Sequence, residues 1–353
     1  MIESCHWHKF LLPKVGEGSN ERVRRMKNTS TPIPPRGDLT VCFAHIAYPM
    51  DGVFEKRNTG INHFQVRTQK DLNDRIEDLD VLVVSGLWGN HLVESSRRLR
   101  FIQSIGAGYD QFPLDELRVR GIRLASASGV NLNAVSEHAF SLILAFSRQI
   151  HIGRDNQRAR FWRGMVPDIH SREDELSGKT LGIIGLGKIG SRVATLAKAF
   201  GMHVIATKRN PATAEGPADE IYPPDRLHDL LSRSDFVVLN CSLTEETKGI
   251  IDREAFAKMK PSAYLVNVAR GACIDEPALL EALRSGEIAG AGIDHFWEDP
   301  LPGNSPFWDM DNMIITPHTG GETRMYEENV IDILLENLSR LWEGKKPLVN
   351  QVV

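Results

Sequence analysis

The sequence lacks the features of a membrane protein, of a disulfide-stapled secreted domain and of a zinc-binding module. No apolar run approaches the roughly 18 residues that a membrane-spanning helix needs. The four cysteines of the 353-residue chain are widely spaced and form no CxxC pair. They indicate reduced thiols in a reducing compartment, which favours the cytoplasm, and they predict no bound metal.

An excess of one charge is also missing. The 42 Lys and Arg residues nearly balance the 46 Asp and Glu residues, which leaves a net charge of -4. This balance gives no reason to expect nucleic acid or an anionic membrane as a partner. The length suits two domains, and the apolar and charged contents of 41% and 25% are those of an ordinary globular protein.

Regular periodicity is missing from residues 1–38, whose end is rich in Ser, Thr and Pro. This composition predicts a flexible N-terminal tail. Its basic residues leave an organelle-targeting role open, although Glu3, Glu17 and Glu21 depart from the acid-poor pattern of targeting peptides.

From Leu39 onward, short β-rich runs alternate with helical patterns in two series. The first series is LTVCFAHI, FQVRTQ, VLVVSG, RFIQSIG and RLASA, and the second is TLGIIG, MHVIAT, FVVLN, AYLVNVA, IAGAGID and NMIIT. Their spacing leaves room for crossover helices between parallel strands. The pattern therefore predicts two doubly wound, Rossmann-like α/β domains, each built on a parallel sheet.

The second series opens with a glycine-rich turn, GLGKIG, which matches G-x-G-x-x-G at Gly185, Gly187 and Gly190. An apolar strand precedes it and an amphipathic helix pattern follows. In such a turn the first glycine makes the tight bend, the second admits a pyrophosphate and the third lets the helix pack on the strand. The helix N-terminus adds free N–H groups for the phosphates. A glycine turn without a ligand is the alternative, and the context favours a dinucleotide.

Polar side chains follow three of the apolar runs in the second series. Arg270 follows AYLVNV, and its planar fork suits a carboxylate. Asp294, Glu298 and Asp299 follow a second run, and His318 follows a third. Ligands of α/β proteins bind at the carboxyl ends of the strands. An arginine, a carboxylate and a histidine there indicate carboxylate capture combined with general acid–base chemistry.

Several motifs in order resemble the D-isomer-specific 2-hydroxyacid dehydrogenase family from Leu39 to the C-terminus. They are SIGAGYD, GVNLNAVSEHAF, LSGKTLGIIGLGKIG, MKPSAYLVNVARGACIDEPALLEAL, AGAGIDHFWEDP and ITPHTGG. The resemblance implies a discontinuous substrate domain, residues 39–140 and 320–353, around a dinucleotide-binding domain, residues 141–319. It also implies a homodimer and hydride transfer between NAD(P)H and a 2-oxo acid, which yields a 2-hydroxy acid.

The resemblance assigns roles by position. Arg270 matches the family's substrate-carboxylate arginine and His318 its proton donor. The family's third catalytic residue is usually a glutamate before a proline, and this position holds Asp299, with Glu298 beside it as the other candidate. Further expected cofactor contacts are Lys188 and Ile189 on the pyrophosphate turn, Val268 and Ala269 in the cleft, Asp294 at the nicotinamide amide, and Gly320. The expected substrate contacts are the backbone of Gly106 and Ala107, and Trp88 in the loop GLWGNH.

The residues after the strand VIAT predict the choice of cofactor. NAD-preferring relatives place an acid there, which binds the adenine ribose and repels a 2′-phosphate. This chain has Lys208 and Arg209 instead. The two cations predict a preference for NADP over NAD, with NAD still usable, unless both simply project into solvent.

The sequence leaves the substrate open among glyoxylate, hydroxypyruvate and bulkier 2-oxo acids. Trp88 either forms a wall of the substrate pocket or packs into the base of its own loop. A binding protein of the dinucleotide-sensing corepressor kind is the alternative from another class. Formate oxidation is a weaker alternative, because that group usually has glutamine where this chain has Asp299.

Overall fold

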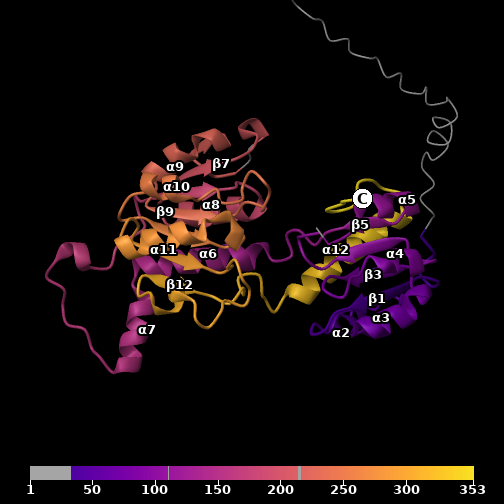
Figure 1. The fold of residues 1–353 in the computed structure, drawn as a ribbon. Helices are drawn as coiled ribbons and strands as arrows, with labels where there is room; N and C mark the ends of the chain where they lie inside the picture. The colour runs from indigo at the N-terminus through magenta and orange to yellow at the C-terminus, as the bar shows by residue number, and fades with distance from the viewer. Residues whose placement is uncertain (1–32, 110, 214–215) are drawn as a thin grey trace, which may run out of the picture. The chain divides into compact units, whose positions relative to one another are not determined.

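The computed structural model describes residues 33–109, 111–213 and 216–353, so residues 1–32 of the expected tail, residues 1–38, lie outside the described part (Figure 1). The chain divides into two compact units. The first comprises the residues up to Ala127 together with Ile331–Val353, and the second comprises Ser128–Val330. Within the described part, no helix combines the length and apolar character needed to cross a membrane.

The first unit is built on a parallel sheet. Over the described residues its strand order is β2-β1-β3-β4-β5. The strands are β1 (Thr40–Ala44), β2 (Asn62–Val66), β3 (Val81–Val84), β4 (Phe101–Ser104) and β5 (Arg123–Ala125). The connecting helices are α2 (Met50–Glu55), α3 (Gln69–Arg75), α4 (His91–Ser95) and α5 (Leu114–Arg120). The run VLVV of β3 is fully buried, as expected for a central strand of a parallel sheet covered on both faces.

The C-terminal segment completes the first unit. Helix α12 (Tyr326–Trp342) presents the buried amide of Asn337, whose Nδ2 donates to Gln103 Oε1 at 3.0 Å and whose Oδ1 accepts from Val349 N at 2.7 Å. Trp342 Nε1 donates to Pro34 O at 2.8 Å, and Ile33 is buried. Residues 33–38 are expected to belong to the flexible tail. The structure instead packs the start of this segment, Ile33 and Pro34, on the first unit.

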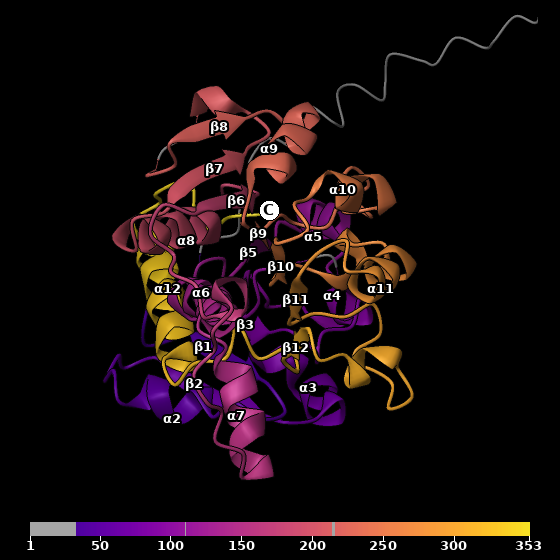
Figure 2. The same cartoon turned by 90° about the vertical axis from the view of Figure 1, so that its left-hand side faces the viewer.

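The second unit holds a larger parallel sheet. Over the described residues its order is β12-β11-β10-β9-β6-β7-β8, which Figure 2 shows as a stack from β8 to β12. The strands are β6 (Thr180–Ile184), β7 (His203–Thr207), β8 (Glu220–Tyr222), β9 (Phe236–Leu239), β10 (Tyr264–Asn267), β11 (Gly290–Ile293) and β12 (Met313–Ile315). The strand order reverses between β6 and β9, the point at which ligands bind in doubly wound sheets. The two parallel sheets confirm the expected fold class.

Helices cover both faces of the second sheet. Helices α6 (Leu132–Ser147) and α8 (Lys188–Ala199) pack on one face, and α9 (Leu227–Arg233), α10 (Arg253–Lys258) and α11 (Glu276–Ser285) pack on the other. A further helix, α7 (Ile150–Ala159), follows α6. The whole of α6 belongs to the second unit, whereas the resemblance implies a domain boundary at residue 140, inside this helix. The short edge strand β8 is not among the expected strands.

Candidate active site

The candidate catalytic residues of the second unit follow neighbouring strands. Arg270 lies three residues beyond the end of β10, Asp294 directly follows β11, and His318 lies three residues beyond β12. These strands are adjacent and parallel in the order β12-β11-β10. Parallel strands end at the same edge of a sheet, so the topology brings together side chains that are far apart in the sequence.

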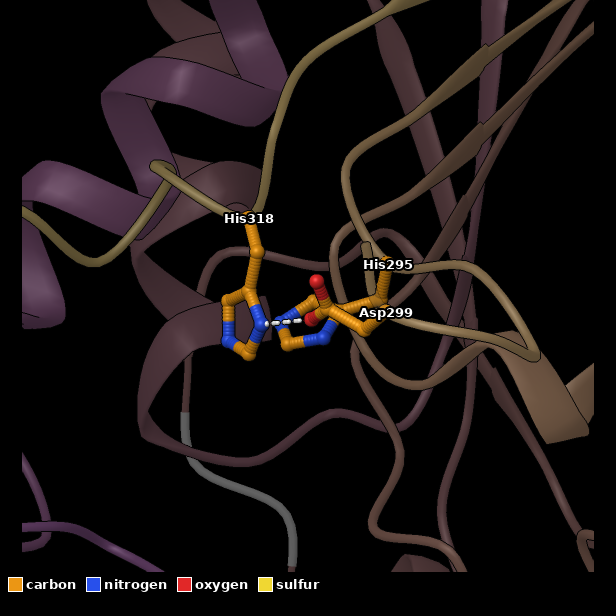
Figure 3. Close-up of side chains that lie close together, drawn as sticks. All are labelled: His295, Asp299 and His318. Carbon is orange, nitrogen blue, oxygen red and sulfur yellow. Dashed lines mark hydrogen bonds and ion pairs between the residues drawn. The ribbon is translucent and has the colours of Figure 1, made fainter. Parts of the chain in front are cut away.

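His318 and Asp299 form the central pair (Figure 3). His318 Nδ1 and Asp299 Oδ2 lie 2.5 Å apart, and the two side chains are 50% and 51% exposed. A carboxylate beside Nδ1 leaves Nε2 of the imidazole directed elsewhere. Of the two candidates, Asp299 is therefore the acid that contacts the histidine, although it is one methylene shorter than the glutamate usual in the family. The neighbouring Glu298 is exposed.

A buried carboxylate holds the loop that carries His318. Asp294 Oδ1 accepts hydrogen bonds from Thr316 Oγ1 at 2.6 Å and from the Thr319 N–H at 3.0 Å, while Oδ2 accepts from the Gly320 N–H at 3.0 Å. Asp294 is only 2% exposed. His318 adopts the left-handed backbone conformation, with φ of 55°, which is unfavourable for a residue with a side chain. The hydrogen bonds to Asp294 thus maintain a bend that His318 would not adopt alone.

Gly320 belongs to the same arrangement. A Cβ atom at this residue would lie 2.8 Å from Asp294 Oδ2 and 3.2 Å from a ring carbon of His138. His138 Nε2 also lies 2.9 Å from Thr316 Oγ1. Glycine is therefore needed here for close packing of the loop against the buried carboxylate.

His295 is a member of the site that the sequence analysis missed. Its ring centroid lies 3.5 Å from that of His318, and the residue is 9% exposed. Asp294 accepts hydrogen bonds from the Thr319 and Gly320 N–H groups, whereas the side chain of His295 lies beside His318 and Asp299 (Figure 3). Its position next to Asp294, just after a strand, is the signal from which His295 could have been predicted. Burial, together with the neighbouring charges of His318 and Arg270, lowers the pKa of His295 to about 4.

Arg270 is exposed at the sheet edge, and a buried amide shapes the turn before it. Asn267 Nδ2 donates to Arg270 O at 3.0 Å, and the Ala269 N–H donates to Asn267 Oδ1 at 2.9 Å. Arg270 Nη1 donates to Ala269 O at 2.7 Å. A guanidinium has five N–H donors, so most of its donors can still bind a carboxylate. Val268 and Ala269 are buried behind it.

The glycine turn has the geometry of a phosphate cradle. Gly185 has φ of 99°, and a Cβ atom there would lie 2.8 Å from the Cys241 backbone. A Cβ atom at Gly190 would lie 2.4 Å from Gly185 O, whereas none of the described atoms lies within 4 Å of one at Gly187. Helix α8 begins at Lys188, and its N-cap residue Gly187 has no side chain to bond the first N–H groups. Open space and uncapped N–H groups fit a pyrophosphate.

Four of the other expected cofactor residues lie on this turn or directly after the neighbouring strand β7. Ile189 packs partly on the core of the second unit, and Lys188 is exposed, with Nζ 3.5 Å from Ser128 O. Thr207 at the end of β7 accepts a hydrogen bond from the Gly185 N–H at 3.3 Å through Oγ1. The next two residues are Lys208, which is half-buried, and Arg209, which is exposed.

The expected substrate residues of the first unit lie near the ends of β3 and β4. Gly106 O accepts from the Ala127 N–H at 2.9 Å, and Ala107 follows on the exposed side of the same loop. The ring of Trp88 lies 5.0 Å from that of Phe112, and its Nε1 donates to Asn90 Oδ1 at 3.0 Å. Trp88 therefore packs on Phe112 and forms a hydrogen bond within its own loop.

Comparison with known proteins gives consistent matches. Residues 140–320 match the family model described as D-isomer specific 2-hydroxyacid dehydrogenase, NAD binding domain. A glyoxylate reductase of Pyrococcus furiosus is 37% identical over 292 residues, which cover 80% of this chain and 85% of that protein. A solved D-isomer specific 2-hydroxyacid dehydrogenase family protein from Aeromonas salmonicida has a TM-score of 0.79 and 29% identity, covering 90% of this chain and 99% of that chain.

A second solved structure shares the fold at lower identity. It is an acyclic imino acid reductase in complex with NADPH and D-Arg, with a TM-score of 0.74 and 25% identity. The match covers 89% of this chain and 100% of that chain.

The buried His295 predicts a loss of stability in mild acid. Its pKa is lowered from the ordinary 6.5 to about 4, so the unfolded chain takes up a proton that the folded chain does not yet bind. Stability is therefore present above pH 6.5 and decreases as the pH falls toward 4, by about 3 kcal/mol from this group. Urea unfolding of the wild type and of His295→Phe between pH 4 and 7.5 measures the effect. Equal pH dependence in the two proteins would contradict this prediction.

Proposed function

Because this chain belongs to the D-isomer specific 2-hydroxyacid dehydrogenase family, we propose that it reduces small 2-oxo acids to D-2-hydroxy acids, reversibly, with NADPH preferred over NADH. The family is shown by the matching NAD-binding model and by a 37% identical glyoxylate reductase. The chain is accordingly an oxidoreductase that uses a nicotinamide dinucleotide. Glyoxylate and hydroxypyruvate are the proposed substrates, since that relative bears the name glyoxylate reductase.

The observation that supports this function most directly is the contact of His318 Nδ1 with Asp299 Oδ2 at 2.5 Å. An imidazole bonded to a carboxylate on one nitrogen can carry and release a proton on the other. Arg270 follows β10, which is the neighbour of β11, the strand that precedes Asp294 and His295. Arg270 is exposed, so its guanidinium can bind a substrate carboxylate. Proton donor and anion receptor thus lie at one sheet edge.

The proposed roles follow from these positions. Arg270 binds the carboxylate of the 2-oxo acid and orients the substrate. His318, protonated beforehand, donates the proton at Nε2 to the carbonyl oxygen as negative charge develops there. Asp299 stabilises the imidazolium through Nδ1 and fixes the orientation of the ring. Asp294 positions His318 through the loop, and its expected contact with the nicotinamide amide belongs to the same proposal.

The glycine turn and the helix behind it are the proposed cofactor site. The N–H groups at the start of α8, with Gly185, Gly187 and Lys188, would hold the pyrophosphate. Val268 and Ala269 lie near the carboxyl end of β10, where the nicotinamide half belongs in this family. When bound, the reduced dinucleotide supplies the hydride.

We propose that the second unit is the cofactor domain and the first the substrate domain. The family model, which matches residues 140–320, supports the first part. In the first unit, the exposed loop at Gly106 and Ala107 offers backbone N–H groups for the substrate carboxylate. Trp88 keeps a proposed place near the substrate side chain.

Turnover measurements test the proposed function. The purified protein should oxidise NADPH in the presence of glyoxylate or hydroxypyruvate. The turnover rates with bulkier 2-oxo acids show how large a substrate side chain the pocket accepts. Tight binding of NADPH or NADH with no oxidation by any 2-oxo acid would favour the corepressor-like alternative. None of the relatives named above supports that alternative.

The Asp299–His318 pair gives a prediction with a matched control. Asp299→Asn should lower kcat/KM for reduction by about 10- to 150-fold, because a hydrogen bond between charged groups contributes about 1.5–3 kcal/mol. Glu298→Gln should leave kcat/KM unchanged. If only Glu298→Gln lowers kcat/KM, Glu298 is the partner of His318.

The end of β7 supports the preference for NADPH. Lys208 and Arg209 stand directly after this strand, where an acid would bind the adenine ribose in an NAD-preferring relative. Two cations instead suit a 2′-phosphate. The imino acid reductase of the same fold was solved with NADPH.

Arg209→Ala should therefore weaken NADPH binding by about 10- to 150-fold, the loss expected for one charge-assisted contact. NADH binding should change little, and added salt should reduce the preference of the wild type. Arg253→Ala removes another exposed arginine of the second unit, which pairs with Glu281, and serves as the control. Fluorescence titration with both cofactors measures the affinities. Wild-type protein that binds NADH as tightly as NADPH would overturn the preference.

We further propose a homodimer, supported by an exposed apolar arm in the second unit. Helix α7 and the segment after it extend away from the sheet (Figure 1). Trp162 and Met165 are 96% and 99% exposed there, and Ile150, Phe161 and Ile169 are also exposed. Large apolar side chains exposed together on one segment suit a protein–protein contact, and a second copy of the chain is the partner that the family resemblance implies.

Trp162→Ser combined with Phe161→Ser should convert the dimer to a monomer of 39.5 kDa, because truncating central aromatic side chains removes most of the binding energy at an interface. Light scattering gives the mass directly. Val119→Ser, at an exposed position on α5, is the control and should remain dimeric. A wild-type protein that is monomeric at micromolar concentration would refute the proposal.

We place the protein in the cytoplasm, as the cysteines support. Cys42, Cys241 and Cys273 are free thiols in the described part of the chain, and Cys42 and Cys273 are buried. Free buried thiols suit a reducing compartment. A fluorescent fusion to the full chain tests the location, including any targeting role of residues 1–32, and accumulation in an organelle would refute it.

A further inference from the structure

We propose that His295, Asp299 and His318 bind a transition-metal dication such as Zn²⁺, and that the bound ion inhibits the enzyme. One ligand atom from each of the three side chains lies within 4.8 Å of the other two. Figure 3 shows both imidazoles and the carboxylate converging on the same space. Two imidazoles and one carboxylate form a ligand set that Zn²⁺ favours.

The distances are close to those of an occupied site. Zn²⁺ binds imidazole nitrogen and carboxylate oxygen at about 2.0–2.2 Å, which places the ligand atoms of a tetrahedral site about 3.4 Å apart. The 2.5 Å contact between Asp299 and His318 must lengthen, and the longest separation, within 4.8 Å, must shorten. Movements of about 1 Å accomplish both.

The burial of the three residues determines which of them moves. His295 is 9% exposed and packed at the end of β11, so it provides a fixed ligand position. Asp299 and His318 are half exposed, so their side chains can turn toward an ion. An ion held by these three residues keeps a fourth coordination position for water or a substrate oxygen.

The ligand atoms of the site favour a softer dication over Mg²⁺ or Ca²⁺. Asp299 is a ligand, and the buried Asp294 adds a second negative charge, whereas Arg270 opposes a cation. Mg²⁺ and Ca²⁺ prefer sites made of oxygen ligands, whereas imidazole suits Zn²⁺, Co²⁺ and Ni²⁺. The two histidine ligands therefore favour Zn²⁺, Co²⁺ and Ni²⁺ over Mg²⁺ and Ca²⁺.

Inhibition rests on the proposed role of His318, whereas binding of the ion does not. A metal ion at Nδ1 of His318 takes the lone pair and displaces the proton that the imidazolium carries there to solvent. The remaining N–H at Nε2 is then a much weaker acid. His318 cannot donate its proton to the substrate carbonyl until the ion leaves.

The binding experiment uses the untagged full-length protein, stripped of metal with a chelator, and Co²⁺ and Zn²⁺ as probes. Visible absorption of Co²⁺ and calorimetry with Zn²⁺ should show one ion per chain in the wild type. His295→Gln and Asp299→Asn should each bind at least about tenfold more weakly, since each loses a ligand. His203→Gln removes a histidine that lies near Asp219 and Glu220, and this control should bind as the wild type does.

The activity experiment follows NADPH oxidation with glyoxylate and expresses each rate relative to the metal-free rate of the same protein. Zn²⁺ should inhibit the wild type, a chelator should restore the activity, and Mg²⁺ should have no effect. His295→Gln should need at least about tenfold more Zn²⁺ for the same inhibition. The site is refuted if the wild type binds neither probe, or if His295→Gln and Asp299→Asn both bind as tightly as the wild type. Binding without turnover of any 2-oxo acid would support the site and refute the proposed function.

Discussion

The buried carboxylate of Asp294 is the constraint on which the arrangement of the site depends. A charge that is 2% exposed would be unfavourable unless hydrogen bonds compensated its desolvation. The compensation comes from Thr316 Oγ1 and from the backbone N–H groups of Thr319 and Gly320. The loop must therefore wrap around the carboxylate, and this wrapping places His318 in its left-handed conformation. The position of His318, the proposed proton donor, follows from satisfying a buried carboxylate.

The residue after Asp294 connects this structural role with the chemistry. Asp294 accepts hydrogen bonds from the loop backbone, whereas the next residue, His295, lies beside His318 at the point where Asp299 contacts it. A buried imidazole beside the half-exposed pair gives the site a fixed ligand position. In our proposals the same edge serves both as the acid–base pair and as a ligand set for a transition-metal dication, and a bound ion would prevent proton transfer by His318.

The topology of the second sheet brings the remaining parts together. Strands β10, β11 and β12 are adjacent, and their carboxyl ends carry Arg270, Asp294 and His318. Strands β6 and β9 meet where the strand order reverses, and the glycine turn follows β6. Residues close to this reversal are suited to a dinucleotide, whereas the neighbouring strand ends are suited to the reacting acid. Distant segments become one site because parallel strands end at one edge.

The sequence by itself determined the fold class, the glycine turn and most of the polar residues at the strand ends. These features depend on short patterns: apolar runs of strand length, glycines at fixed spacing, and a polar residue directly after a strand. The three-residue edge strand β8, the buried amide of Asn337 and the packing of Trp88 on Phe112 were decided by the tertiary structure. So were the contact of Asp299 with His318 and the place of His295. Each depends on partners distant in the chain or on a backbone bend, and no local pattern encodes such a distance.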